Sequence, residues 1–286
     1  MKIKTIPKKS GGVRTIYVQG PREKQKYRLL GYQMAEFHKH NEVIINNNPV
    51  CHGFIEGRSP ISNAAAHIGK TYSLSVDLKD FFDTITPIHL ERAGVEQVLA
   101  NDVCYLGTAK QGLSSSPPSS NVVGIILDKE IAAVLNNITY TRYADDLTFS
   151  SDNLADLIVL RDRLPNLIER CGFCINNKKT RIQSSNFGRR IITGVAVDDK
   201  LYPTKEQKRR LRAGRHNVIK VLKTLEFVRW TGHFVLYSVL LELHRKTFAR
   251  FLGLREWCKL QLPTVSYEGK LIKTFVIHET KRAFTE

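Results

Sequence analysis

The segment TRYADDLTFSS at residues 141–151 constrains the fold most, because it places two adjacent carboxylates between two short runs of strand-forming residues. Threonine, tyrosine and phenylalanine favour strands, whereas aspartate is a poor strand residue and neighbouring carboxylates repel each other. The pattern predicts a β-hairpin with Asp145 and Asp146 at its tight turn, where the alternation of side chains relaxes. A solvated turn that contains two aspartates is the alternative, and the strands on both sides argue against it.

A third carboxylate, Asp77, follows the strand-like segment TYSLSVDL at residues 71–78. Carboxylate oxygens are ligands that Mg²⁺ prefers, and a bound cation would offset the repulsion between the aspartates of the hairpin. Two metal ions about 3.5–4 Å apart can activate an attacking hydroxyl and stabilise a leaving phosphate. We therefore expect Asp77, Asp145 and Asp146 to share a site with two Mg²⁺ ions.

The remaining pattern predicts an α+β fold. A strand, a Gly-Gly turn, a second strand and a helix are expected within residues 4–37, and a short helix at 63–69. Further helices are expected after the Ser-Pro segment near residue 116 and over residues 153–172, followed by strands over 173–183 and 189–203. This order predicts helices packed on one face of an antiparallel sheet, with a basic helical region after residue 203.

The charge of the chain indicates a polyanionic partner. Lysine and arginine number 44 against 27 aspartates and glutamates, a net charge of +17, and the excess is concentrated in residues 1–30 and 201–286. Clustered charge of one sign is typical of proteins that bind a phosphate backbone, although general solubilising charge is the alternative. We find no apolar run long enough to cross a bilayer and no leader at the start, so we expect a cytoplasmic protein without a membrane partner.

Four motifs together resemble reverse transcriptases, in the family's order and spacing: YADD at 143–146, SVDLKDFFDTI at 75–85, QGLSSSPPSSN at 111–121 and INNKKT at 175–180. Two more, NAAAH at 63–67 and ITG at 192–194, are similar to signatures of the bacterial retron reverse transcriptases. The resemblance covers about residues 8–200. It implies a right-hand polymerase fold with fingers at 1–69 and part of 86–113, a palm with an antiparallel sheet at 70–203, and a basic helical thumb at 204–286.

The resemblance also implies roles for single residues. Asp77 and Asp145 would ligate both metal ions and Asp146 would be more peripheral, so the implied ligands are Asp77, Leu78, Asp145 and Asp146. Lys179 would protonate the pyrophosphate that leaves, and a surface lysine paired with an acid is the alternative.

The implied nucleotide pocket consists of Lys9, Arg14, Phe82, Gln111 and Gly112. Phe82 would lie under the sugar and exclude a 2′-hydroxyl, although core packing is its alternative. Arg14 and Lys9 would hold the triphosphate, and both are otherwise solvated charges. Gln111 would offer its amide to the substrate, and Gly112 would let the backbone approach closely.

RNA contacts are implied at two places. Asn63 and His67 lie four residues apart on one expected helical face, with a helix-capping asparagine and a hydrogen-bonded core histidine as the alternatives. Thr193 and Gly194 would let a nucleic-acid backbone pass, and a plain turn between strands explains them equally well. The basic face of the helix expected after residue 203 would contact phosphates through Lys208, Arg209, Arg210, Arg212 and Arg215.

The predicted function is therefore that of a retron RNA-directed DNA polymerase. It would copy a structured non-coding RNA with deoxynucleotides and Mg²⁺ into a branched, RNA-linked DNA, in anti-phage defence beside a separate effector protein. One alternative is a group II intron-like or other bacterial reverse transcriptase. The other is an RNA-binding scaffold with a silent polymerase site.

Overall fold

The computed structural model of the 286-residue chain describes residues 1–7, 11–214 and 216–217. The chain divides into two compact units, Met1–Leu201 and Tyr202–Glu286, each with its own internal contacts. Among the described residues, no helix combines the length and the apolar character needed to span a membrane. The part of the second unit that is described consists mainly of a helix over residues 205–214.

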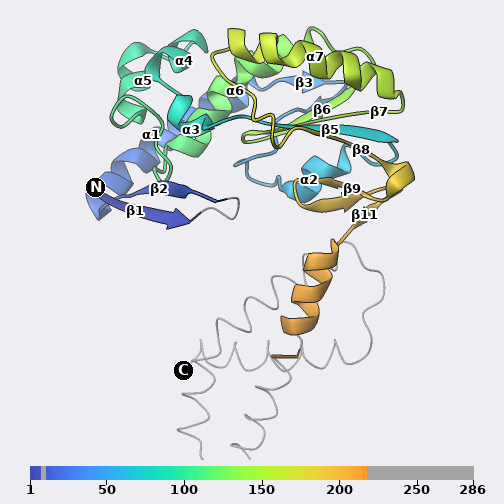
Figure 1. Cartoon of the computed structure of the whole chain (residues 1–286). Coiled ribbons are helices and arrows are strands. Elements are labelled where there is room, and N and C mark those ends of the chain that lie inside the picture. The colour runs from blue at the N-terminus through green and yellow to red at the C-terminus, as the bar shows by residue number, and fades with distance from the viewer. Residues whose placement is uncertain (8–10, 215, 218–286) are drawn as a thin grey trace, which may run out of the picture. The chain divides into compact units, whose positions relative to one another are not determined.

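The first unit contains its helices and strands in a mixed order along the chain (Figure 1). The strands are β1 (Lys2–Pro7), β2 (Val13–Val18), β3 (Ile44–Ile45), β4 (Asn48–Pro49), β5 (Tyr72–Asp77), β6 (Thr139–Tyr143), β7 (Asp146–Ser151), β8 (Arg181–Ser184), β9 (Arg190–Ile192), β10 (Val195–Val197) and β11 (Leu201–Tyr202), whose second residue opens the other unit. The helices are α1 (Pro21–Asn41), α2 (Pro60–Ala65), α3 (Phe81–Thr84), α4 (Pro87–Arg92), α5 (Gln97–Val103), α6 (Ser116–Ala132) and α7 (Leu154–Arg170), with a 3₁₀ turn at Ser185–Phe187.

Four antiparallel strands form the central sheet in the order β6-β7-β5-β8. The expected hairpin is present as β6 and β7, in which Tyr143 pairs with Asp146 and Thr139 with Ser150. Strand β7 also pairs with β5, from Tyr72 opposite Ser151 to Asp77 opposite Asp146. The sheet therefore brings residues about 70 positions apart in the sequence to the same edge.

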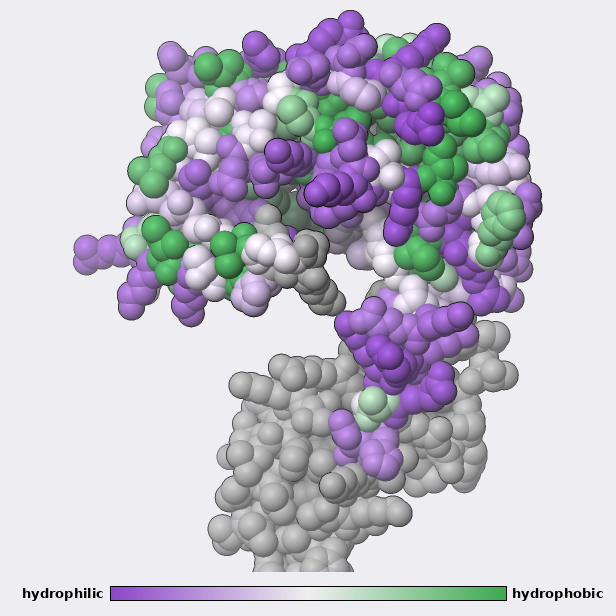
Figure 2. All heavy atoms as spheres, in the orientation of Figure 1, coloured by the Kyte–Doolittle hydropathy of each residue, from purple (hydrophilic) through white to green (hydrophobic). Residues whose placement is uncertain are grey.

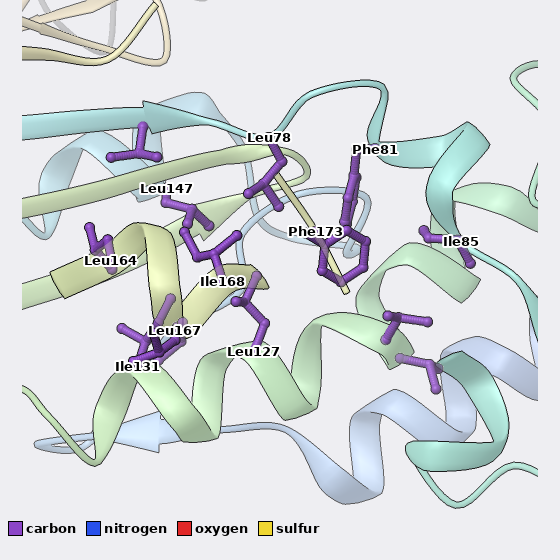
Figure 3. Close-up of a cluster of buried hydrophobic side chains, with 14 of the residues drawn as sticks. Leu78, Phe81, Ile85, Leu127, Ile131, Leu147, Leu164, Leu167, Ile168 and Phe173 are labelled. Carbon is purple, nitrogen blue, oxygen red and sulfur yellow. The ribbon is translucent and has the colours of Figure 1, made fainter. Parts of the chain in front are cut away.

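One face of the central sheet is apolar and is covered by α6 and α7. Leu78 next to β5 and Leu147 on β7 belong to a buried cluster to which α6 contributes Leu127 and Ile131, and α7 contributes Leu164 and Leu167 (Figure 3). Burying one such leucine side chain stabilises the fold by roughly 1.5–3 kcal/mol. The alternation along β5 and β7 thus fixes which strand face meets the helices, as the sequence pattern predicts.

The opposite face of the sheet carries polar side chains and is partly covered by α2, β9 and β10. Strand alternation places Ser73, Ser75 and Asp77 there, on the opposite side from Leu74 and Val76. Helix α2 contacts β6, β9 and β10, and the small sheet has the order β11-β10-β9. The visible surface is mainly hydrophilic, with hydrophobic residues in separated groups (Figure 2).

Two expected element boundaries differ from the structure. The helix expected at residues 63–69 occurs earlier, as α2, because Ser59 caps its start by accepting from the backbone N–H groups of Ile61 and Ser62. The strand expected over residues 173–183 begins only at Arg181. The residues before it form a loop that passes over the end of β5, where the Lys79 backbone N–H donates to the Cys174 carbonyl at 2.8 Å.

Candidate active site

The three predicted aspartates come together at one edge of the central sheet. Asp77 ends β5 and lies directly opposite Asp146, which begins β7. The backbone N–H of Leu78 donates to the carbonyl oxygen of Asp145 at 3.0 Å, so the hairpin turn is also bonded to the end of β5. Strands β5 and β7, which are far apart in the sequence, therefore bring all three aspartates to the same end of the sheet.

The turn that carries Asp145 is tight and closely backed. Ala144 and Asp145 are the two turn residues, and Ala144 has a φ of +56°, which two-residue hairpin turns favour. Gly53 lies against this turn, because a Cβ atom placed on it would lie 2.6 Å from the Ala144 nitrogen. A side chain at position 53 would therefore push the turn out of place.

The environment of the turn disfavours negative charge. Burial raises the pKa of Asp145, and the neighbouring Asp77 raises it further, while Lys179 and Arg14 act in the opposite direction. The Asp146 carboxylate is exposed at the strand end, yet it loses enough hydration to the surrounding protein, next to Asp145 and Asp77, that its pKa rises to about 6. Such mutual repulsion is what a divalent cation would relieve.

The third carboxylate, Asp77, is 7% exposed and is held by two side chains from the loop before β8. Lys179 Nζ lies 2.6 Å from Asp77 Oδ1, and Asn176 Nδ2 donates to Asp77 Oδ2 at 3.1 Å. The hydrogen bond to the Asp77 carboxylate raises the pKa of Lys179, which keeps its ammonium group protonated. The sequence interpretation named Lys179 but missed Asn176, although both belong to INNKKT.

The donor set fits a divalent cation in chemistry, but the described residues do not include three acidic, histidine or cysteine side chains that converge as a ready-made metal cage. The Asp77 carboxylate is turned toward Lys179 and Asn176 instead. Leu78 was implied as a ligand, and its side chain is 1% exposed in the core, so only its carbonyl oxygen is a ligand atom. A cation at this edge would compete with Lys179 for Asp77.

Of the residues expected in the nucleotide pocket, the structure places Arg14 on β2, Phe82 in α3, and Gln111 and Gly112 in the loop before α6. Arg14 is exposed on β2, and its charge lowers the pKa of Asp145, which opposes the larger effect of burial. Phe82 is partly buried in α3, with its ring 5.8 Å from that of Phe81. Gln111 holds β2 through its backbone, since its carbonyl oxygen accepts from the Tyr17 N–H at 2.8 Å. Lys9 lies outside the described residues.

The absence of a side chain at Gly112 serves the packing of β2 rather than the expected close approach to the substrate. Its φ is +102°, and a Cβ atom there would collide with the Tyr17 carbonyl oxygen and come within 3.1 Å of the Tyr17 nitrogen. The glycine therefore lets β2 dock on this loop. Close approach of a nucleotide is not required to explain it.

Direct RNA contact by Asn63 and His67 is contradicted by the structure, since both side chains are 0% exposed. The His67 ring lies 2.7 Å from both Ser150 Oγ and Thr141 Oγ1 on the polar face of the sheet. Burial, and next the charge of Arg190, lowers the pKa of His67 to about 3, so the ring is neutral. The hydrogen-bonded core histidine, one of the alternatives left open by the sequence, is the correct interpretation.

Asn63 also faces inward, and it is not a helix cap. Its Nδ2 group donates to Thr193 Oγ1 at 3.4 Å, and the Thr193 hydroxyl donates to the Pro60 carbonyl at 3.2 Å. Thr193 and Gly194 are the two residues between β9 and β10, with φ values of +45° and +79°. The plain turn explains Thr193, while Gly194 is exposed at the tip.

The predicted basic face lies on the helix over residues 205–214. Arg209, Arg210 and Arg212 are exposed there, and Lys208 is partly exposed. Arg210 forms an ion pair with Glu206 one turn away on the same helix. Arg215 lies outside the described residues.

A buried ion pair behind the hairpin was not found from the sequence. Arg142 Nε lies 2.9 Å from Asp128 Oδ1, and the Tyr140 hydroxyl donates to the same oxygen at 2.7 Å. The Arg142 side chain is 0% exposed, and a Cβ atom on Gly124 would collide with its guanidinium group. The signal in the sequence is a charged residue at a position where strand alternation requires an apolar one, since Tyr140 and Arg142 share the helix-covered face.

The sheet, the helices on one face and the aspartates at its edge define a right-hand polymerase fold, as predicted. Among solved structures, the telomerase from Candida albicans in complex with a TWJ fragment of telomeric RNA aligns with a TM-score of 0.50 at 12% identity, over 88% of this chain and 54% of that one. At this identity the likeness shows the fold alone.

The sequence comparisons define the family. Residues 6–254 match the family model described as reverse transcriptase (RNA-dependent DNA polymerase). The Retron Mx65 reverse transcriptase of Myxococcus xanthus is 32% identical over 245 residues, which cover 74% of this chain and 54% of that protein. The Retron Ec83 reverse transcriptase of Escherichia coli is 30% identical over 234 residues, which cover 73% of this chain and 72% of that protein. The chain belongs to the reverse transcriptase family and, within it, to the retron reverse transcriptases.

Proposed function

We propose that the chain is an RNA-directed DNA polymerase of a retron. The observation that carries this proposal is the pairing of Asp77 with Asp146 at the sheet edge, with Asp145 in the adjoining turn. The named relatives are retron reverse transcriptases, and the chain spans about half of the first of them, 54% of its length. The activity, substrates and partners of the whole protein are therefore part of the proposal.

The three aspartates would hold two divalent metal ions, with Mg²⁺ the best match to their oxygen atoms. Bound at this edge, the ions would activate the primer hydroxyl and neutralise the charge that develops on the phosphates. Asp77, Asp145 and Asp146 would hold the ions, with Asp146 the more peripheral of the three. Asp77 would then be shared between a cation and Lys179, whose protonated ammonium would be in place to donate a proton to the pyrophosphate.

Three further groups would position the deoxynucleotide. Arg14 on the exposed hairpin strand would hold the triphosphate, since a guanidinium group forms paired hydrogen bonds to phosphate oxygens. Phe82 would lie against the sugar and exclude a 2′-hydroxyl. The Gln111 side chain would bind the substrate, while its backbone keeps β2 next to the pocket.

The finer proposal concerns the template and the product. We infer a structured non-coding RNA as template and primer, a branched RNA-linked DNA as product, and a role in anti-phage defence with a separate effector protein. The net charge of +17 and the exposed arginines of the helix over residues 205–214 support binding to such an RNA. The proposed domains remain fingers at 1–69 with part of 86–113, a palm at 70–203 and a basic helical thumb at 204–286.

The test uses the full-length chain expressed from its native locus. Asp145→Asn and Asp146→Asn, alone and combined, are compared with Asp162→Asn, which removes an exposed aspartate of α7 that pairs with the adjacent Arg161. Incorporation of labelled deoxynucleotides on a primed RNA template is measured, and the bound nucleic acid is digested separately with RNase and DNase.

We expect DNA synthesis to disappear in the double variant and to persist in Asp162→Asn. A short DNA that stays joined to RNA supports the retron assignment. Synthesis that survives the double substitution overturns the catalytic proposal, and recovery of random cellular RNA alone favours an RNA-binding scaffold.

A further inference from the structure

Phe54 is an aromatic residue in a backbone conformation that aromatic residues rarely adopt. Its φ is +58°, in the left-handed region that glycine and asparagine tolerate and bulky side chains disfavour. Its side chain is 49% exposed, so burial in the core does not account for a phenylalanine here. A strained position that keeps a half-exposed ring points to a role for the ring itself.

The segment before Phe54 is fixed to the catalytic turn, which explains how the strain is maintained. The His52 N–H donates to the Arg142 carbonyl at 2.8 Å, and Asn121 Nδ2 donates to the Gly53 carbonyl at 2.8 Å. Gly53 itself lies against Ala144. The backbone that carries the Phe54 ring is therefore held by the same contacts that hold the turn of Asp145.

The Phe54 ring ends a row of aromatic rings that leads from solvent into the core. Its centroid lies 6.2 Å from that of Phe82, and the planes are inclined by 56°. On the other side, Phe82 lies 5.8 Å from Phe81, which lies 5.2 Å from Phe173. Phe81 and Phe173 are 2% and 1% exposed, so they form the fixed end of the row. Phe82 therefore lies between Phe81, which is anchored in the core, and Phe54, which is half exposed to solvent.

We propose that Phe54 is a positioning residue for Phe82 and thereby sets the selectivity for deoxynucleotides over ribonucleotides. This inference rests on the proposed role of Phe82 at the sugar. A 2′-hydroxyl would push the Phe82 ring away from the nucleotide, and a ring that is free on its outer side would yield. Phe81 blocks movement on the core side, and Phe54 blocks movement on the solvent side.

The test compares full-length variants in primer extension on poly(U) primed with oligo(dA), with dATP or ATP as the single substrate. Phe54→Asn removes the ring and accepts the left-handed backbone, whereas Phe54→Tyr keeps the ring. Leu106→Asn is the matched control, because Leu106 is also left-handed, with a φ of +50°, and is 72% exposed. Phe82→Ala tests the underlying role of Phe82.

In Phe54→Asn we expect the ratio of kcat/KM for dATP to that for ATP to fall about two- to tenfold, the effect of losing one aromatic pair. The fall in this ratio should come from a higher kcat/KM for ATP, and the thermal midpoint of unfolding should stay unchanged or rise. Phe54→Tyr and Leu106→Asn should keep the wild-type ratio.

An unchanged ratio in Phe54→Asn, while Phe82→Ala admits ATP, overturns the inference and leaves the proposed function intact. An unchanged ratio in Phe82→Ala shows instead that the sugar role in the proposed function is wrong, and the inference falls with it. A lower ratio that is accompanied by a lower thermal midpoint and is shared by Leu106→Asn also overturns it, because general loosening then explains the effect.

Discussion

The folded structure disfavours the negative charge of Asp146, so the pKa of this carboxyl group differs between the folded and the unfolded chain. Its pKa is raised to about 6 by partial loss of hydration and by Asp145 and Asp77. A raised pKa means that the folded chain binds the proton more tightly than the unfolded chain does. The contribution of proton binding by Asp146 to the stability of the fold is therefore fully present below about pH 4 and is lost as the pH rises through about 6.

We expect Asp146→Asn to stabilise the chain at neutral pH, because the substitution removes a repelled charge. The gain should be on the order of 1 kcal/mol, or about 2–4 °C in the thermal midpoint, once solvent screening of this exposed carboxylate is allowed for. The difference from wild type should shrink as the pH falls from 7.5 to 4. Thermal unfolding across this range measures it, in buffer that contains EDTA. A constant difference at all pH values would contradict the electrostatic explanation.

Helix α6 and strand β6 are joined by a charge pair rather than by apolar packing alone. Arg142 and Asp128 are 0% and 2% exposed in their side chains, and Arg142 Nη2 donates to Asp128 Oδ2 at 2.9 Å. Removing one partner leaves the other charge buried without compensation, which costs more than the pair itself contributes. Since Arg142 directly precedes the YADD residues in the hairpin, this pair fixes β6 against the helix layer behind the site.

We expect Arg142→Met to destabilise the chain by about 3–5 kcal/mol, since it leaves Asp128 unpaired in the core. Asp128→Asn should cost a similar amount, and the double variant should cost less than the sum of the two. Denaturant unfolding of the three variants gives this coupling energy. The exposed pair Lys26 and Asp102, joined at 2.9 Å, is the control, for which Lys26→Met should cost about 0–1 kcal/mol. Additive effects at Arg142 and Asp128 would show that the pair is not coupled.

At the scale of the whole molecule, the excess of positive charge is spread over several elements and is not confined to one site. The net charge is +17, and part of this excess lies on described residues of β1, β2 and α1 and on the helix over residues 205–214. Binding through phosphate contacts releases counterions, so it weakens with salt in proportion to the number of contacts.

We expect the affinity for a labelled RNA stem-loop to fall steeply between 50 and 200 mM salt. Substituting Arg209 and Arg212 by Gln should reduce the slope of log K against log salt by about 0.7–0.9 for each residue that contacts a phosphate. Lys39→Gln is the control, because Lys39 is exposed on α1 and pairs with Glu36 at 3.6 Å. Fluorescence anisotropy at five salt concentrations measures the slopes. An unchanged slope in the arginine variants would remove this helix from the RNA interface.

Local patterns were enough to predict the elements that carry the site. The hairpin, β5, α6 and α7 follow from alternation, turn residues and helix caps, all of which act over a few residues. The two aspartates at the turn and the third at a strand end could be predicted together because both lie at the ends of strands, where polar groups meet. The family could be named from motifs for the same reason, since each motif is a short stretch of sequence.

The tertiary structure decided which side chains meet and which way they face. Asn176 and Asp77 are 99 residues apart in the sequence, and only the path of the loop over β5 brings them together. Asn63 and His67 face inward because α2 packs on the polar side of the sheet, which no local pattern reveals. Gly112 serves β2, and Phe54 lies beside Phe82, because segments distant in the sequence dock there. The sequence by itself determined the elements and the acidic residues at their ends, while contacts between distant elements arise only from packing.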